Sequence, residues 1–292
     1  MQITLIGLGK MGTAMAQRIV QGNFNLTVFN RTKEKMQPLI QAGAKAASSV
    51  KEAAVQADIV ITALLDDASI LQIVNGDDGF LSSLKRGAIH VNTATILPET
   101  AKLLARLHHK HGSIYIAAPV LGVPKVAAAG GLTTFAAGDT AAIERCTPVL
   151  NTYSANIVPI GNEPYQANVV KISVNYLLAA SIEAMGEIYT FAEKSNVNLD
   201  IINKLFHTIY AHLGIKRYVD KIKQRDFDDV NFDLKAGFKD LCLFQKAFTD
   251  VHVAPTLANI VKDKMMIALA QGMSEKDWSI VTEITRKEAG LD

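Results

Sequence analysis

The chain has 292 residues, of which 20% are charged, and a formal net charge of +2. This mild balance, with its basic residues scattered along the chain, argues against nucleic acid or a membrane as the main partner and favours a small molecule. The two cysteines, Cys146 and Cys242, lie far apart, so we expect reduced, buried thiols and neither a disulfide framework nor a metal site. No apolar run reaches the length of a membrane span, and we expect a cytoplasmic protein.

The first predicted element is a short apolar strand at residues 3–6, which runs directly into the turn Gly7-Leu8-Gly9-Lys10-Met11-Gly12. This turn has the GxGxxG spacing of a dinucleotide site: Gly7 allows the tight turn, Gly9 lets backbone N–H groups approach a pyrophosphate, and Gly12 lets the next helix pack closely. The same spacing also occurs in ordinary turns. The strand before it and an amphipathic helix predicted at 11–20 favour nucleotide binding, with the pyrophosphate at the helix N-terminus.

The second predicted strand, at residues 26–29, indicates which dinucleotide is bound. It ends at Asn30, where an NAD-binding fold places an acidic residue on the ribose. Asn30 is followed by Arg31, Thr32, Lys33 and Lys35, and the forked donors of an arginine suit a 2′-phosphate. We therefore expect NADP(H) to be preferred over NAD(H). The alternative is that these basic residues are only the solvated start of a helix.

Further along, short β-rich runs alternate with helical stretches, a pattern that predicts an α/β fold with a Rossmann-type, doubly wound, mostly parallel sheet up to residue 162. The additional strands are expected at 58–62, 88–92, 114–117, 133–137 and 156–160, and the helices at 32–42, 98–109 and 140–150. Asp66 and Asp67 are expected to begin another helix, preceded by Leu64 and Leu65 on the adenosine side of the cofactor.

Three histidines, His108, His109 and His111, lie just before Gly112. Such a cluster can bind a metal, but we expect a solvated helix end, where polar and cationic side chains are favoured.

After residue 161 the predicted strands stop. Residues 163–194 have no interior proline and carry apolar residues on nearly every side, which predicts a buried helix of roughly 48 Å that links two domains and packs against a partner subunit. More helices are expected near 201–211, 234–250, 255–270 and 276–287. We therefore predict a Rossmann domain over 1–162, an all-helical domain over 163–292, and a homodimer.

The long helix carries the best candidate for chemistry. An enzyme that reduces a carbonyl with a nicotinamide needs a proton donor beside the oxygen that gains negative charge. Lys171 has the required group, and Asn175 shares its helix face at the i+4 position. On spacing alone, a lysine that extends its head to solvent from an apolar helix is an equally good interpretation.

Taken in order along the whole chain, these features resemble the β-hydroxyacid dehydrogenase family. That family includes 3-hydroxyisobutyrate dehydrogenases and NADPH-dependent glyoxylate and succinic semialdehyde reductases, with 6-phosphogluconate dehydrogenases and imine reductases as relatives. The segments that carry the resemblance, beyond the glycine motif, are Met15-Ala16, Asn30-Arg31-Thr32, Pro98-Glu99-Thr100, Ala118-Pro119-Val120, Gly131-Leu132-Thr133 and Lys239-Asp240-Leu241.

The resemblance implies roles for individual residues. Lys171 and Asn175 would be the catalytic lysine and asparagine, and Thr95 would lie near both nicotinamide and substrate. Phe232 and Lys239-Asp240-Leu241 would form the C-terminal pocket motif. In this motif Lys239 would lie by the cofactor and Asp240 by the substrate.

One segment departs from the family pattern. The family usually reads Asp-Ala-Pro-Val-Ser-Gly-Gly, where this chain has Ala117-Ala118-Pro119-Val120-Leu121-Gly122-Val123 followed by Pro124. A serine hydroxyl and a glycine that help to hold a substrate carboxylate are missing, although Gly122 keeps a backbone N–H. We expect Leu121 and Gly122 to line a pocket with less preference for anions, unless the change lies on a loop that faces away from the ligand.

The resulting prediction is an oxidoreductase that transfers hydride between NADP(H) and a small aldehyde, ketone or hydroxy acid. One alternative is an imine reductase, which Lys171 disfavours because that branch commonly has another residue there. The other is a non-catalytic NADP-binding module, against which the presence of both Lys171 and Asn175 argues.

Overall fold

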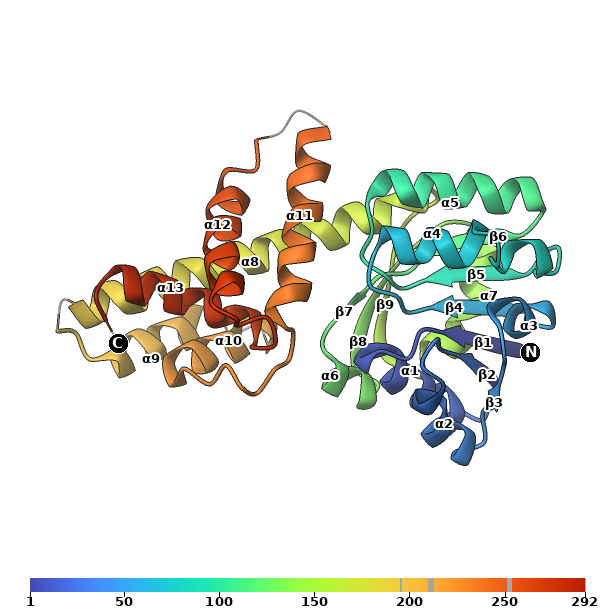
Figure 1. The fold of residues 1–292 in the computed structure, drawn as a ribbon, viewed down its shortest axis with the longest axis horizontal. Helices are drawn as coiled ribbons and strands as arrows, with labels where there is room; N and C mark the ends of the chain where they lie inside the picture. Colours follow the sequence, from blue (N-terminus) through green and yellow to red (C-terminus); the bar gives the residue numbers. More distant parts are fainter. Residues whose placement is uncertain (195, 210–212, 251–253, 292) are drawn as a thin grey trace. The chain divides into compact units, whose positions relative to one another are not determined.

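The computed structural model describes residues 1–194, 196–209, 213–250 and 254–291. The chain divides into two compact units, Met1–Lys171 and Ile172–Asp292. The first contains a mostly parallel sheet with helices and the second is helical in its described part, as the sequence predicts (Figure 1).

The sheet of the first unit has the order β3-β2-β1-β4-β5-β6-β8-β7, and β9 pairs with β8. Neighbouring strands run parallel except where β8 pairs with β6 and with β7. The order of the first six strands is that of a doubly wound dinucleotide-binding fold. The strands are β1 (Gln2–Ile6), β2 (Asn25–Phe29), β3 (Lys45–Ala46), β4 (Ile59–Thr62), β5 (Ile89–Asn92), β6 (Ile114–Ala117), β7 (Val120–Leu121), β8 (Leu132–Ala137) and β9 (Ser154–Gly161).

Helices cover both faces of this sheet, with α4 and α5 along one face and α1 with α2 along the other (Figure 1). Strands covered on both faces have no solvent-exposed side, and every residue of β4 and β5 is buried, including the polar Thr62, His90 and Asn92. The helices of the first unit are α1 (Lys10–Gln21), η1 (Lys33–Met36), α2 (Gln37–Gln41), α3 (Val50–Val55), α4 (Asp67–Asn75), η2 (Leu81–Ser83), α5 (Pro98–His111), α6 (Pro124–Ala128) and α7 (Thr140–Leu150).

Local sequence signals explain where several helices begin and end. The Asp66 carboxylate accepts a hydrogen bond from the Ser69 N–H at 2.8 Å and so caps α4, which confirms the predicted helix start. Pro98 occupies the first turn of α5, where a missing N–H costs nothing, and Gly112 ends that helix in the left-handed region at φ +81°.

The prediction of a solvated end for α5 is wrong for His108. His109 is exposed, but His108 is completely buried and bonds to His90 and Ser113. The expectation for the cysteines also needs a correction, because Cys146 is buried whereas Cys242 is only half-buried.

The second unit is built from helices around a core that includes Phe244, Leu241 and Trp278. Helix α8 (Tyr165–Lys194) begins in the first unit and continues into the second. The other helices are α9 (Leu199–Ile209), α10 (Leu213–Gln224), α11 (Leu234–Asp250), α12 (Thr256–Ala270), η3 (Trp278–Ile280) and α13 (Val281–Glu288). The end predicted at 211 for the helix that corresponds to α9 lies outside the described residues.

By length and composition, α8 could cross a membrane, which contradicts the expectation that no apolar run is long enough. Among the described residues it is the one helix of this kind, and 44% of its most apolar window is buried inside the structure. A core helix of a globular protein meets the same criterion.

Candidate active site

The strand order creates a topological switch point beside β1. The chain passes from β1 to β2 on one side and returns to β4 on the other side of β1. In open α/β sheets, ligands bind outside the carboxyl ends of the strands at such a point. The glycine motif follows β1 directly, so it lies at this edge.

The three glycines have different reasons to lack a side chain. Gly7 has φ +100°, and a Cβ there would lie 2.5 Å from the Ala63 carbonyl oxygen. A Cβ on Gly12 would lie 2.0 Å from the Gly7 carbonyl oxygen. Around Gly9, no heavy atom of the described residues lies within 4 Å of such a Cβ. The fold therefore needs Gly7 and Gly12, whereas Gly9 leaves open space.

That open space adjoins the start of α1. Gly9 is the N-cap residue of this helix and offers no side-chain cap, and Lys10 begins the first turn. The first N–H groups of a helix have no partner within the helix and attract anions. The turn therefore fits the pyrophosphate of a dinucleotide, which would occupy the volume that a larger residue at position 9 would fill.

Asn30 has a role that the sequence did not reveal. Its Oδ1 accepts the Leu8 N–H at 2.9 Å, and its Nδ2 donates to the Thr32 carbonyl at 3.0 Å. The side chain thus fastens the glycine turn to the end of β2. Arg31 and Thr32 are exposed beyond it, and Arg31 is a cation at the position expected for a 2′-phosphate.

The two leucines predicted for the adenosine side differ in exposure. Leu64 is half-buried, and its Cδ2 would be 2.8 Å from a Cβ on Gly7, so it packs against the glycine turn. Leu65 is 53% exposed. Met11 is half-buried on the first turn of α1.

The segment that carries Thr95 is attached to the start of α8 within the first unit. The Ile96 N–H donates to Asn168 Oδ1 at 3.4 Å, and the neighbouring Leu97 N–H donates to Asp67 Oδ1 at 3.0 Å. Lys171 follows Asn168 at the i+3 position and so shares its side of the helix. The turn of α8 that holds Lys171 therefore lies at the carboxyl edge of the sheet.

The burial of Lys171 contradicts the interpretation in which its head extends into solvent. It is 7% exposed, so its side chain does not extend into solvent. A lysine is almost never this buried without a partner or a function.

In the second unit, Asp240 connects two other predicted site residues. The Asn175 Nδ2 donates to Asp240 Oδ2 at 3.0 Å, and the Lys239 ammonium lies 2.6 Å from Asp240 Oδ1. Asn175 is 8% exposed and Asp240 is 3% exposed. The carboxylate is therefore compensated by an amide and a cation, and it fixes the orientation of Asn175.

Phe232 is placed by the buried Asp277. The Phe232 N–H donates to Asp277 Oδ2 at 3.4 Å, and its ring packs edge-on against Trp278 with the centroids 5.2 Å apart. Backbone and ring are thus both held.

The segment that departs from the family pattern forms a short strand and a helix start. Leu121 pairs with Thr133 of β8, and Gly122 has φ +138°. Pro124 opens α6, where its fixed φ suits the first helical turn. Leu121 is half-buried and Gly122 is exposed. The proline is therefore explained by α6.

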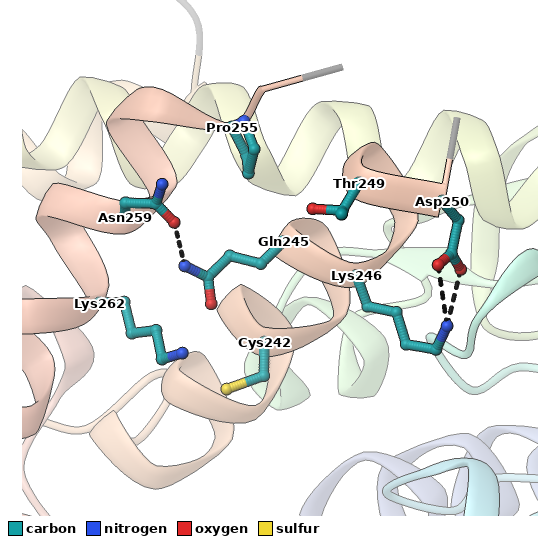
Figure 2. A pocket seen from close by; sticks show the side chains of 8 residues that line it. All are labelled: Cys242, Gln245, Lys246, Thr249, Asp250, Pro255, Asn259 and Lys262. Carbon is teal, nitrogen blue, oxygen red and sulfur yellow. Dashed lines mark hydrogen bonds and ion pairs between the residues drawn. The ribbon is translucent and has the colours of Figure 1, made fainter. Parts of the chain in front are cut away.

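A surface pocket with a volume of about 450 Å³ lies in the second unit between α11 and α12 (Figure 2). Figure 2 shows Lys246 paired with Asp250 and Gln245 bonded to Asn259. No predicted site residue is among its lining residues, which are Cys242, Gln245, Lys246, Thr249, Asp250, Pro255, Asn259 and Lys262.

Sequence reasoning missed the residues that hold the predicted ones. Asn30 was expected to bind the ribose end rather than to brace the glycine turn, and Asn168 and Asp67 were not expected to bond to the segment after β5. Their positions were the available signal. Asn168 is a polar residue on an apolar helix, one turn before Lys171, and Asp67 is a second aspartate directly after the helix cap Asp66.

Two family descriptions match the chain in succession. Residues 2–161 match the NAD binding domain of 6-phosphogluconate dehydrogenase, and residues 166–284 match the family described as NAD-binding of NADP-dependent 3-hydroxyisobutyrate dehydrogenase.

Individual proteins agree with this over the full length. An oxidoreductase of Bacillus subtilis is 34% identical over 279 residues, covering 96% of this chain and 98% of that protein. A structure of Mycobacterium tuberculosis 3-hydroxyisobutyrate dehydrogenase with L-serine has a TM-score of 0.86 at 25% identity, covering 98% and 99%. An imine reductase of Myxococcus stipitatus in complex with NADP+ has a TM-score of 0.67 at 20% identity, covering 98% and 100%, a likeness of fold alone.

Proposed function

The chain belongs to the β-hydroxyacid dehydrogenase family of NAD(P)-dependent oxidoreductases, and we propose that it uses NADP(H) and Lys171 to interconvert a small carbonyl compound and its alcohol. One observation carries this proposal. Asn168 joins the segment after β5 to α8, and this places the turn that holds the buried Lys171 at the edge of the sheet where the glycine motif lies.

The preference for NADP(H) is supported by residues 30–32. Asn30 has no negative charge that would repel a 2′-phosphate, and its amide is already engaged with the glycine turn. Arg31 is exposed and has forked donors that match phosphate oxygens. The ribose end therefore has a cation and no carboxylate on this segment.

When bound, the nicotinamide supplies or accepts the hydride. Lys171 donates a proton from its ammonium group to the substrate oxygen during reduction and accepts one during oxidation. Asn175, oriented by Asp240 at 3.0 Å, presents its amide to the substrate. Lys239 offsets the charge of Asp240, so the pair carries no net charge.

For the substrate we propose a small aldehyde, ketone or hydroxy acid with a weaker need for a carboxylate than is usual in the family. Leu121 replaces a hydroxyl with an apolar side chain. The exposed Gly122 keeps a backbone N–H that can bind one oxygen. Thr95, Phe232 and Asp240 would complete the substrate contacts.

We also propose a homodimer in the cytoplasm. In support of a dimer, α8 leaves large apolar side chains on its surface, with Val169, Leu177 and Ile188 at 44%, 62% and 41% exposure. Light scattering after gel filtration tests this, since a monomer at micromolar concentration would contradict it.

A substrate panel with a lysine variant tests the main proposal. Aldehydes, hydroxy acids and cyclic imines are assayed with NADPH and with NADH, using wild type, Lys171→Ala and Lys194→Ala. Lys194 is an exposed residue in the last turn of the same helix and serves as the control. We expect carbonyl reduction with NADPH and a loss of at least about 100-fold in kcat for Lys171→Ala, the usual scale for a general acid.

The outcomes separate the alternatives. NADPH affinity, measured by fluorescence titration, should stay the same in all three proteins. Turnover of cyclic imines alone would support an imine reductase, and NADPH binding without turnover of any compound would support a binding module. Near-normal kcat in Lys171→Ala would remove the proposed mechanism.

A further inference from the structure

A continuous chain of hydrogen bonds runs through the interior of the first unit and ends under the segment that carries Thr95. It joins side chains from β4, β5, α5 and β6, and each of them is at most 5% exposed. Its members in order are Ser113, His108, His90, Thr62, Asn92 and Tyr115.

The links are all of ordinary length. They are Ser113 Oγ to His108 Nδ1 at 2.9 Å, His108 Nε2 to His90 Nδ1 at 2.9 Å, His90 Nε2 to Thr62 Oγ1 at 2.9 Å, Thr62 Oγ1 to Asn92 Oδ1 at 3.0 Å, and Asn92 Nδ2 to the Tyr115 hydroxyl at 3.2 Å. Aromatic rings enclose the two imidazoles: Phe80 lies edge-on to His90, and Tyr115 stacks on His108. The hydrogen-bonded side chains are therefore buried among aromatic rings.

One backbone group sets the direction of the whole chain. The Ala94 N–H donates to Asn92 Oδ1 at 3.1 Å, and a backbone N–H can only donate, so this atom is the carbonyl oxygen. Thr62 must then donate its single hydroxyl proton to Asn92 Oδ1. The Thr62 oxygen is left as an acceptor for His90 Nε2.

The same logic continues outward. Because a neutral His90 that donates from Nε2 accepts at Nδ1, His108 donates to it from Nε2–H. The Nδ1 of His108 then accepts the Ser113 hydroxyl proton at 2.9 Å, which is shorter than the 3.4 Å from that hydroxyl to the His108 carbonyl oxygen. Both imidazoles are thus neutral Nε2–H tautomers. Burial, and secondly the neighbouring imidazole of His108, holds the pKa of His90 well below its usual value, which agrees with the neutral state.

The chain does not conduct protons to the substrate. It passes through the amide of Asn92, which donates and accepts hydrogen bonds but does not pass a proton from its nitrogen to its oxygen under ordinary conditions. What it can do is hold Asn92 in one orientation. Asn92 in turn holds Ala94, while Thr62 binds the N–H and hydroxyl of Thr93 through its carbonyl oxygen at 3.0 and 2.8 Å.

We propose that His90 and His108 are positioning residues for the turn at Thr93, Ala94 and Thr95. Every link from Ser113 to Asn92 donates in the same direction, toward Asn92. This fixes the orientation of the Asn92 amide, which in turn holds the backbone that precedes Thr95. The consequence for catalysis rests on the proposed function, in which this turn lies beside the nicotinamide and the substrate. The positioning itself concerns the free protein.

The tautomers are tested first, by NMR of protein labelled with 15N at the histidine rings. We expect Nε2 to carry the proton in His90 and His108, with no titration of either ring between about pH 8 and pH 5. An Nδ1–H tautomer at either residue, or titration of either ring near the ordinary pKa of histidine, would overturn the assignment.

The positioning is tested by a matched pair of variants. Thr62→Val keeps the size of the side chain but removes the hydroxyl, and Thr62→Ser keeps the hydroxyl. We expect the Ala94 amide to exchange with deuterium at least about tenfold faster in Thr62→Val, the scale of one lost buried hydrogen bond, and at the wild-type rate in Thr62→Ser. Equal exchange in all three proteins would contradict the proposal. If Thr62→Val does not fold, Ser113→Ala removes the outermost donor and is measured in the same way.

The catalytic consequence has its own readout. In Thr62→Val we expect kcat to fall about tenfold while the KM for NADPH stays within about twofold, and Thr62→Ser should restore kcat. His109→Gln, on the exposed part of the same helix, is the control and should match wild type. A fall in melting temperature with no change in kcat would mean that these hydrogen bonds only stabilise the fold, and would refute the proposed effect on catalysis. If wild type reduces no carbonyl, the proposed function fails, and the NMR and exchange results still decide the positioning.

Discussion

Acid should weaken the fold of the first unit through His108. Burial, with a smaller contribution from the charge of His111, lowers the pKa of His108 from its ordinary 6.5 to about 3. Between these two values the unfolded chain binds a proton on this ring and the folded protein does not. The stabilisation from neutral His108 is therefore fully present above pH 6.5 and is lost progressively as the pH falls toward 3.

The size of the effect follows from proton linkage. At about pH 5 the unfolded ring is almost fully protonated and the folded ring is not, so His108 alone lowers the free energy of unfolding by about 2 kcal/mol relative to pH 8. His90 acts with the same sign, because burial lowers its pKa as well. Carboxylates such as Asp58, whose pKa is lowered chiefly by its hydrogen bond from Gln2 N–H, add to the loss at lower pH.

Comparing wild type with His108→Gln isolates the contribution of His108 to the pH dependence of stability. Urea unfolding of wild type and His108→Gln is followed by circular dichroism at about pH 8 and pH 5, and Trp278, the single tryptophan, reports the second unit by fluorescence. Between the two pH values, wild type should lose about 2 kcal/mol more than the variant, since the carboxylates contribute equally to both. Equal losses would mean that His108 is not held neutral in the folded protein, and would refute the argument.

Three further results are expected from residues of the predicted cofactor site. Gly9→Ala adds a Cβ with no heavy atom of the described residues within 4 Å, so its melting temperature should stay near wild type while NADPH binding weakens at least about tenfold; normal binding would contradict the pyrophosphate assignment. Gly12→Ala places a Cβ 2.0 Å from the Gly7 carbonyl oxygen and should cost about 1–3 kcal/mol of stability in a urea titration. Arg31→Ala should raise the KM for NADPH about 10- to 100-fold, the range for a hydrogen bond to a charged group, and leave that for NADH within about twofold. An equal rise for both cofactors would exclude a 2′-phosphate contact.

The elements predicted from sequence were those with a long or simple pattern. Central strands such as β1 and β4 appear as apolar runs because they are buried on both faces, and α7 and α11 have the predicted bounds. The strands β3 and β7 have two residues each, too few for any period to be visible. The helix α10 was not predicted, although its buried Tyr218, Val219 and Ile222 recur at helical spacing between charged residues.

The candidate site could be proposed from sequence where its residues form a local pattern. The glycine turn, Arg31 and the pair Lys171 and Asn175 are recognised by spacing alone or by family resemblance. His108 was assigned to solvent because its two histidine neighbours and the following glycine are typical of a helix end. Its partner His90 lies on another element 18 residues away, and a hydrogen bond between side chains of different elements leaves no period in the sequence.

Helix α8 carries side chains that bond within each of the two units. Asn168 bonds to the segment after β5 in the first unit, and Asn175 bonds to Asp240 in the second. The two asparagines lie at i−3 and i+4 from Lys171, so all three share one side of the helix. The lysine is thus flanked on both sides by an amide that is already bonded to its own unit. Each of these two contacts holds its own turn of α8 within the unit that makes it.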